Sequence, residues 1–321
     1  MLEFARHIAQ ALKVQRFDDA LQGYADWYAL DPAYFTTGDV RRDEVRTHIH
    51  NAANLARKAL YDRVSHLSHV SPRIAQALQY FFGLAAKQFQ HALQQPAFFY
   101  IPDLPAKPFY EVDDIPGLAG LVSQLAQFSA ELTALAEHSL EQYVDTSGPV
   151  PNTDDWQRIK ARWLSTHLLR GDEPFVLADP RLAELQQLLT DPIVAHCPPH
   201  AAEAFVSTLL PQAEIPAHYG LSNLKLTVHV PLRVNAASCL TVGGEQRCWD
   251  AGTSVLIFDD SFLHSAFNHD ATRRDVFIFD IWHPALGLAE RDAVRDFMAQ
   301  HRLWSAAYGS LAGLDARLLT P

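Results

Sequence analysis

Residue types that bind metals and carboxylates are concentrated between residues 207 and 283 of the 321-residue chain. His218 and His264 each stand at the end of a predicted strand, beside a turn. In an antiparallel barrel the ends of facing strands meet at one mouth, where two imidazoles can share a metal ion. The chain has 16 histidines, and a single histidine is more often a surface or hydrogen-bonded residue than a ligand. The pair is therefore a hypothesis that depends on the residues around it.

An arginine accompanies the two histidines. Arg274 lies ten residues after His264, at the head of an otherwise apolar strand. A guanidinium binds a carboxylate through two parallel hydrogen bonds, so Arg274 suits the far carboxylate of a 2-oxo dicarboxylate whose other end chelates the metal. An ordinary ion pair with Asp275 is the alternative, and the apolar character of the strand argues against it.

A pattern of period two indicates the strands that position these residues. Residues 225–233 alternate between apolar and polar side chains, which places His229 on the same face as Lys225 and Thr227. Further strand segments are predicted over residues 238–249 (a hairpin), 253–258 and 274–282. Short antiparallel strands joined by turns predict an α+β fold with a jelly roll, that is, a cupin-like double-stranded β-helix.

The predicted hairpin brings two of the three cysteines together. Its tip is Gly243-Gly244, so Cys239 and Cys248 are expected to lie directly opposite each other as a non-hydrogen-bonded pair. In a reducing cytosol we expect two free thiols at this place and not a disulfide.

The N-terminal region has helical periodicity. Apolar residues recur every three or four positions, and Asp31-Pro32 and Ser71-Pro72 are predicted helix boundaries because a residue before proline avoids the helical conformation. The segment 17–32 resembles one tetratricopeptide unit, but a single unit lacks the neighbours that such repeats need, and we interpret it as part of a helical bundle. We predict a helical region over residues 1–93 and a jelly-roll domain over residues 94–321.

Composition restricts the classes of partner. The chain has 26 Lys and Arg against 37 Asp and Glu, a net charge of −11, which argues against a protein that tracks nucleic-acid phosphates. The first residues carry charges and lack the apolar core of a signal peptide, and no run of about 20 apolar residues is present. We expect a cytoplasmic protein that binds neither nucleic acid nor membrane. No pattern predicts its oligomeric state.

The order and spacing of four motifs resemble the catalytic domain of the aspartyl/asparaginyl β-hydroxylase family. They are HxGxxNxKLxxH (218–229), FDDSFxH (258–264), Arg274 and DxWHP (280–284). The resemblance extends from about residue 94 to residue 284 and is dense after residue 201. It implies an iron(II)- and 2-oxoglutarate-dependent oxygenase with a jelly-roll fold. Gly220 stands where most iron oxygenases have a carboxylate ligand two residues after the first histidine, and the family shares this glycine.

The resemblance also implies roles for individual residues. His218 and His264 would be the only protein ligands of Fe(II). Ser207 and Arg274 would hold the far carboxylate of the cosubstrate 2-oxoglutarate, and His229 would contact the cosubstrate near the metal. His218, His264 and Arg274 together would form the catalytic set.

Four further residues lie in the same motifs. Asp260, four residues before His264, is a candidate to orient a histidine ligand or a metal-bound water, with a turn-capping role as the alternative. Thr227 stands where family members have a basic residue, while Lys225 keeps one positive charge on that face and is a candidate substrate contact. Asp280 is expected to be structural.

The activity implied by the resemblance is that of a dioxygenase that consumes O2 and 2-oxoglutarate. It would hydroxylate an unactivated carbon, the β-carbon of an Asp- or Asn-type residue in a peptide or protein, or of an amino acid. Gly220 also leaves a coordination position that chloride could take, which would make the enzyme a halogenase on the same scaffold. A third reading is a metal-free barrel with a peptide-binding helical region, and the intact set of His218, His264, Arg274 and Ser207 argues against it.

Overall fold

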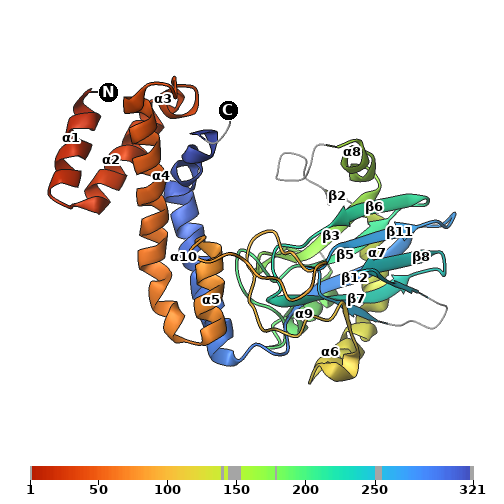
Figure 1. Ribbon diagram of the computed structural model, residues 1–321. Coiled ribbons are helices and arrows are strands. Elements are labelled where there is room, and N and C mark those ends of the chain that lie inside the picture. Colours follow the sequence, from red (N-terminus) through yellow and green to blue (C-terminus); the bar gives the residue numbers. More distant parts are fainter. Residues whose placement is uncertain (1, 139–140, 144–152, 178, 250–254, 319–321) are drawn as a thin grey trace. The chain divides into compact units, whose positions relative to one another are not determined.

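The computed structural model describes residues 2–138, 141–143, 153–177, 179–249 and 255–318. The chain forms two compact units (Figure 1). The helical unit comprises Met1–His69 and Asp296–Pro321, and the barrel unit comprises Val70–Arg295.

The helical unit is built from amphipathic helices around an apolar core. Its elements are α1 (Leu2–Lys13), α2 (Phe17–Leu30), α3 (Pro32–Thr36), α4 (Asp43–Val64), a 3-10 turn (Ser65–His69), most of α10 (Leu288–Ala312) and a 3-10 turn (Leu314–Leu318). Asp31 ends α2 and caps α3, where its side chain accepts a hydrogen bond from the amide of Tyr34 and Pro32 takes the first helical position. The predicted boundary at Asp31-Pro32 is therefore confirmed.

The division between the two units differs from the predicted boundary at residue 93. The C-terminal helix belongs to the helical unit from Asp296 onward, because Leu311 of this helix and Leu314 of the 3-10 turn after it are buried in the core of that unit. The indole Nε1 of Trp304 also donates to the carbonyl oxygen of Ala56 at 2.7 Å. At the other side, the chain from Val70 onward belongs to the barrel unit. Local periodicity does not reveal which unit a helix packs into.

The barrel unit consists of two antiparallel sheets with short helices. The large sheet contains, in spatial order, β1 (Phe109–Tyr110), β10 (Leu256–Phe258), β7 (Lys225–Arg233), β12 (Arg274–Trp282), β5 (Ala204–Leu209), β3 (Trp163–Arg170) and β2 (Glu141–Gln142), and β4 (Glu173–Pro174) pairs with β3. The small sheet contains β6 (Ala213–His218), β11 (His264–Asn268), β8 (Ser238–Val242) and β9 (Glu245–Cys248). The helices are α5 (Pro72–Phe81), α6 (Leu118–Leu125), α7 (Ser129–His138), α8 (Asp154–Lys160) and α9 (Pro180–Leu188), with 3-10 turns at Val112–Asp114 and Ala126–Phe128.

This architecture confirms the predicted α+β fold with a jelly roll. The strand over 274–282 has the predicted bounds, and Pro72 begins α5 after the cap Ser71. The strand predicted over 253–258 is observed at Leu256–Phe258, while residues 253 and 254 lie outside the described part.

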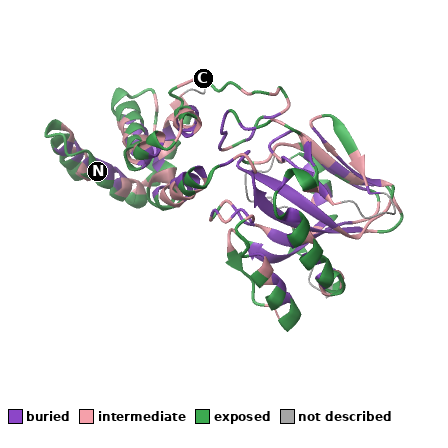
Figure 2. Cartoon of the chain, turned by 90° about the horizontal axis from the view of Figure 1, so that it is seen from below, coloured by how far each residue is buried: buried purple, intermediate pink, exposed green. Residues whose placement is uncertain are grey.

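The two faces of the large sheet have different environments. Leu226, Val228 and Val230 of β7 belong to an apolar cluster that includes side chains of α6, α7 and α9. The intervening residues of β7 face a second cluster, formed by side chains of both sheets. Figure 2 shows the strands largely buried and the helices exposed on their outer faces. The period-two pattern of β7 thus separates a helix-covered face from an inner face between the sheets.

The hairpin of β8 and β9 turns at Gly243 and Gly244, both of which have positive φ. Cys239 and Cys248 are opposed in register, as predicted, and their Cα atoms lie 4.0 Å apart. The expectation of two free thiols is wrong, because a disulfide joins them. Directly opposed residues of a close strand pair bring the two sulfur atoms within bonding reach.

No helix in the described ranges has both the length and the apolar character that crossing a bilayer requires.

Candidate active site

A cavity of about 600 Å³ opens between the two sheets of the barrel unit. It is lined by Tyr219 and by most of the residues singled out from the sequence: Ser207, His218, Gly220, Lys225, Thr227, His229, Asp260, His264, Arg274 and Asp280. Residues separated by more than 70 positions therefore meet in one place, because the sheets bring β5, β6, β7, β11 and β12 together.

His218 and His264 form a close pair in this cavity. His218 ends β6, His264 begins β11, and the two residues are register partners. Their ring centroids are 4.1 Å apart. The predicted meeting of two strand ends is thus observed, on neighbouring strands of the small sheet.

The backbone fixes the tautomer of both rings. Nδ1 of His218 lies 2.8 Å from the carbonyl oxygen of Pro216, and Nδ1 of His264 lies 2.9 Å from that of Phe262. A carbonyl oxygen only accepts, so each Nδ1 carries the proton and each Nε2 keeps its lone pair. This arrangement, with one ring nitrogen donating to a carbonyl and the other available, is typical of metal-binding histidines.

Burial keeps both imidazoles neutral. It lowers the pKa of His218 to about 3, with a further contribution from His264, and it also lowers the pKa of His264. The nearby Asp260 carboxylate acts in the opposite direction on both rings. A neutral imidazole is the form that binds a metal ion.

Among the described residues, no group of three or more His, Cys, Asp and Glu side chains is arranged to hold a metal. Most iron oxygenases have a carboxylate ligand where this chain has Gly220, and here Asp260 is packed closely against Gly220. A Cβ atom there would lie 2.6 Å from the carboxyl carbon of Asp260 and 2.8 Å from its backbone oxygen. The amide of Gly220 also donates to that oxygen at 2.7 Å. A carboxylate-bearing residue at 220 therefore does not fit beside Asp260.

Arg274 is the first residue of β12, and its guanidinium is nearly unpaired. The residue is 1% exposed, and its Nε and Nη1 have no hydrogen-bond partner among the described residues. Burial lowers its pKa to about 10, and Asp275 only partly opposes this effect. A buried cation with unused donors is costly unless an anion completes it.

Two further unpaired groups lie next to this guanidinium. Arg274 packs over the ring of Trp249 at 5.2 Å, and Trp249 stacks with His229 at 6.0 Å. Nε1 of Trp249 and Nδ1 of His229 are both buried and have no partner in the described part of the chain. Burial, then Arg274, lowers the pKa of His229 far below its usual value. These unused polar atoms fit a bound carboxylate better than an apolar ligand.

Ser207 lies beside this group on the adjacent strand. Its register partner on β12 is Val276, which places it diagonally across from Arg274 on the same face. Its hydroxyl oxygen accepts a hydrogen bond from Nε1 of Trp163 at 3.0 Å. The hydroxyl proton is left to be donated into the cavity. The chain thus brings together all five residues predicted to bind iron and 2-oxoglutarate.

Lys225 and Asp260 lie at the opposite end of the strands from Arg274. Nζ of Lys225 bridges Asp280 Oδ1 at 2.7 Å and Asp260 Oδ2 at 3.0 Å. Burial alone would lower the pKa of Lys225, but the two carboxylates raise it well above its usual value. The turn cap expected as the alternative role of Asp260 belongs to Asp259, whose Oδ1 accepts from the amide of Ser261. Asp280, expected to be structural, does anchor Lys225 but also lines the cavity.

Other residues of the cavity were not found from the sequence. Glu203, Tyr143 and His200 line the Lys225 end, and Trp156 and Trp163 contact the ring of His218. No motif marks them. The only signal is the position of Glu203 directly before a strand, which does not show what the strand pairs with.

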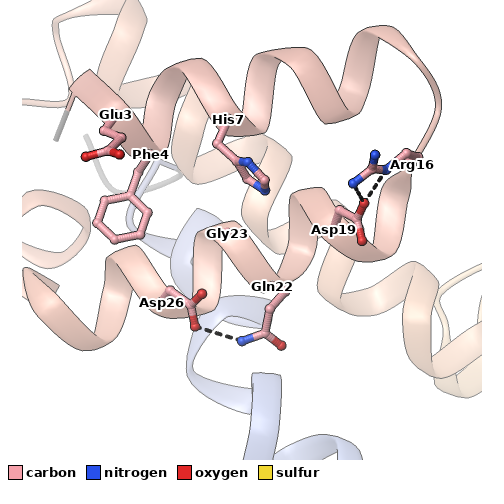
Figure 3. A pocket seen from close by; sticks show the side chains of 8 residues that line it. All are labelled: Glu3, Phe4, His7, Arg16, Asp19, Gln22, Gly23 and Asp26. Carbon is pink, nitrogen blue, oxygen red and sulfur yellow. Dashed lines mark hydrogen bonds and ion pairs between the residues drawn. The ribbon is translucent and has the colours of Figure 1, made fainter.

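The helical unit has a separate cavity of about 550 Å³ between α1 and α2 (Figure 3). It is lined by Glu3, Phe4, His7, Arg16, Asp19, Gln22, Gly23 and Asp26. Arg16 pairs with Asp19, and Gln22 donates to Asp26 at 2.7 Å. None of the predicted site residues lies there, so we assign no chemistry to this cavity.

Comparison with known proteins gives a consistent family. A sequence model described as aspartyl/asparaginyl beta-hydroxylase matches residues 123–284. Aspartate beta-hydroxylase domain-containing protein 2 of Xenopus tropicalis is 30% identical over 219 residues, which is 66% of this chain and 56% of the relative. Aspartate beta-hydroxylase domain-containing protein 1 of Mus musculus is 30% identical over 233 residues, which is 70% of this chain and 62% of the relative. The chain thus matches little more than half the length of these relatives.

Solved structures are only distantly similar to this chain. A 2OG-Fe(II) oxygenase family oxidoreductase of Burkholderia pseudomallei is 16% identical with a TM-score of 0.33, and the match covers 55% of this chain and 94% of that one.

Proposed function

Because this chain belongs to the aspartyl/asparaginyl β-hydroxylase family, we propose that it is an iron(II)- and 2-oxoglutarate-dependent dioxygenase that hydroxylates an unactivated carbon. When bound, iron(II) with 2-oxoglutarate and O2 supplies the oxidation, in which 2-oxoglutarate loses carbon dioxide to become succinate and one oxygen atom enters a C–H bond. The β-carbon of an aspartyl or asparaginyl residue, the position in the family name, is the starting hypothesis for that bond.

The roles of the residues follow from their free atoms. His218 and His264 would bind iron through Nε2, since Nδ1 of each ring is engaged by the backbone. Arg274 and Ser207 would hold the far carboxylate of 2-oxoglutarate. His229 would form a hydrogen bond with the cosubstrate near the metal. Asp260 would orient a metal-bound water, because its Oδ1 is buried without a partner among the described residues.

The observation that carries this proposal is the buried guanidinium of Arg274. It lies in the same cavity as the histidine pair and has two nitrogen atoms without partners. A structural arginine would pair with Asp275, but that carboxylate is engaged by Thr208, Arg233 and Arg273. The alternative hypothesis, that the barrel is a scaffold that binds no metal, does not explain why a buried cation is left unpaired.

Hydroxylation is favoured over halogenation by the charge next to the two histidines. A halogenase needs chloride in the coordination position that a missing carboxylate leaves open. Here the carboxylate of Asp260 fills the space beside Gly220. This carboxylate would repel chloride at that position, whereas its oxygen atoms would accept a hydrogen bond from water.

The proposal predicts that Arg274→Lys weakens 2-oxoglutarate binding at least about tenfold, because lysine cannot form the bidentate pair. The measurement is isothermal titration calorimetry of the Mn(II)-loaded protein with 2-oxoglutarate. Arg247→Lys is the matched control. Arg247 lies on β9 and forms an ion pair with Glu111, and this variant should bind 2-oxoglutarate as tightly as wild type. Equal affinity for wild type and Arg274→Lys would show that Arg274 does not hold the cosubstrate.

A further inference from the structure

The cavity has a second charged end whose chemistry differs from that of the Arg274 end. On β12, Arg274 and Asp280 are six residues apart, which is about 20 Å along a strand. The amide of Glu203 donates to Asp280 Oδ2 at 3.0 Å, so Glu203 lies at the Asp280 end. We call this the Glu203 end; it contains Glu203, Lys225, Thr227, Asp260 and Asp280.

Acidic groups outnumber basic groups at the Glu203 end. Lys225, its only basic member, is shared between Asp260 and Asp280. Both oxygen atoms of Asp280 are engaged, one by Lys225 and one by the amide of Glu203. Three carboxylates therefore face one ammonium group, and Lys225 has little capacity left to bind an acidic substrate.

The Glu203 carboxylate has no strong partner. Tyr143 donates to its Oε2 at 3.4 Å, a long hydrogen bond, and Nε of Arg170 lies 3.8 Å from Oε1 with a side chain that is 50% exposed. Burial, followed by the nearby Asp280, raises the pKa of Glu203. Burial and the charge of Asp280 both disfavour the ionised form of the Glu203 carboxylate. A cation placed against this carboxylate would stabilise the ionised form.

An independent feature marks the same end as a ligand site. Thr227, the register partner of Asp280, is 8% exposed and lines the cavity, but its hydroxyl forms no hydrogen bond with any described residue. Because Thr227 lines the cavity and its hydroxyl is not used by the protein, this hydroxyl is available to a ligand. Thr227 is neutral, so it adds no positive charge that would attract a carboxylate.

We propose that the substrate places a positively charged ammonium or guanidinium group against Glu203, with Thr227 as an additional hydrogen-bonding contact. This inference rests on the proposed oxygenase function. Under this inference a basic residue takes the place of the aspartyl or asparaginyl residue of the starting hypothesis, either in a peptide or as a free amino acid. The three carboxylates around Lys225 give the discrimination, because an acidic side chain would meet an excess of like charge.

The test measures which probes bind to the protein loaded with Mn(II) and 2-oxoglutarate. The probes are one peptide, Gly-Ala-Xaa-Ala-Gly, with Lys, Arg, Gln or Asp at the central position, and free L-lysine and L-arginine. We expect the Lys or Arg peptides, or the free amino acids, to bind at least about tenfold more tightly than the Gln and Asp peptides. The two arms distinguish a peptide substrate from a free amino acid.

Variants of Glu203 identify the group responsible. Glu203→Gln should abolish the preference for the cationic probe over the Gln peptide, and Glu203→Asp, which keeps the charge, should retain part of it. Glu245→Gln, on the exposed hairpin, is the matched control and should keep the wild-type preference. The affinity for 2-oxoglutarate is measured in each variant so that a collapsed cavity is recognised.

Two results would overturn the inference while the oxygenase function stands. The first is that 2-oxoglutarate binds and the Asp peptide binds as tightly as the cationic probes, or that no probe binds. The second is a cationic preference that survives in Glu203→Gln. If the wild-type protein does not bind 2-oxoglutarate at all, the proposed function fails and this inference fails with it.

Discussion

Single residues determine how the histidine pair is prepared for a metal. The carbonyl groups of Pro216 and Phe262 select the tautomer of His218 and His264, and burial keeps both rings neutral. The Nε2 atoms that we propose to bind the metal are thus available without rearrangement of the backbone. At the same scale, Gly220 is required for space, because the carboxylate of Asp260 occupies the position that a side chain would need.

Gly220→Ala is therefore predicted to lower the free energy of unfolding by about 1–3 kcal/mol, because the added methyl group meets the backbone oxygen of Asp260 as well as its side chain. Chemical denaturation of both proteins measures this difference. Gly120→Ala is the matched control: a Cβ there meets no atom within 4 Å, and α6 should gain slight stability. A Gly220→Ala protein as stable as wild type would show that Asp260 moves aside freely.

The residues that the sequence could not reveal are those whose role depends on neighbours across the sheet. His218, His264 and Arg274 were found because their types and spacing form motifs. Glu203 and the disposition of Thr227 depend on the strand register, which a single sequence does not specify.

At the scale of elements, strand alternation was the most reliable guide. It placed His229 on the inner face, and it set the hairpin register that brings Cys239 and Cys248 together. The turn between β10 and β11 was less predictable, since its two consecutive aspartates have different tasks. Asp259 is fully buried and accepts hydrogen bonds from Ser261 and Gln94, whereas Asp260 faces the cavity.

The β10–β11 turn gives a prediction about pH. Burial raises the pKa of Asp259 to about 7, so between roughly pH 4 and pH 7 the folded protein keeps a proton that the unfolded chain releases. Stability contributed by this group is thus present at low pH and is lost as the pH rises through 7. In Asp259→Asn this loss should disappear, and Gln94, whose Oε1 is buried without a described partner, can turn its amide to accept from the new side chain.

Denaturant unfolding at pH 5 and pH 8 measures this effect. The difference in stability between Asp259→Asn and wild type should shift in favour of the variant at pH 8. Asp113→Asn, at an exposed carboxylate, is the control. Parallel pH profiles for wild type and Asp259→Asn would contradict the assignment.

At the scale of the whole molecule, the candidate active site lies within one unit. Every residue that lines the active-site cavity lies within Val70–Arg295, and the helical unit has its own core. The helical character of the N-terminal region was predicted correctly. The return of the C-terminal helix to that region was not, because long-range packing leaves no local pattern in the sequence.

This division predicts that Leu311→Ala destabilises the helical unit by about 2–5 kcal/mol, since the side chain is 1% exposed in its core. Thermal unfolding followed by circular dichroism should show an earlier helical transition, while 2-oxoglutarate binding below that temperature stays at the wild-type level. Leu303→Ala, at an exposed position of the same helix, should change neither. Loss of binding in Leu311→Ala would show that the barrel unit depends on the helical unit.

The proposed function requires the histidine pair and Arg274 to bind iron(II) and 2-oxoglutarate together. The most direct test is an anaerobic titration of the purified protein with both components, followed by the weak visible charge-transfer band of the chelate, in wild type, His264→Ala and Arg274→Ala. We predict a band in wild type that both variants lose or weaken. No band in wild type, with thermal stability unchanged by either component, would contradict the oxygenase function.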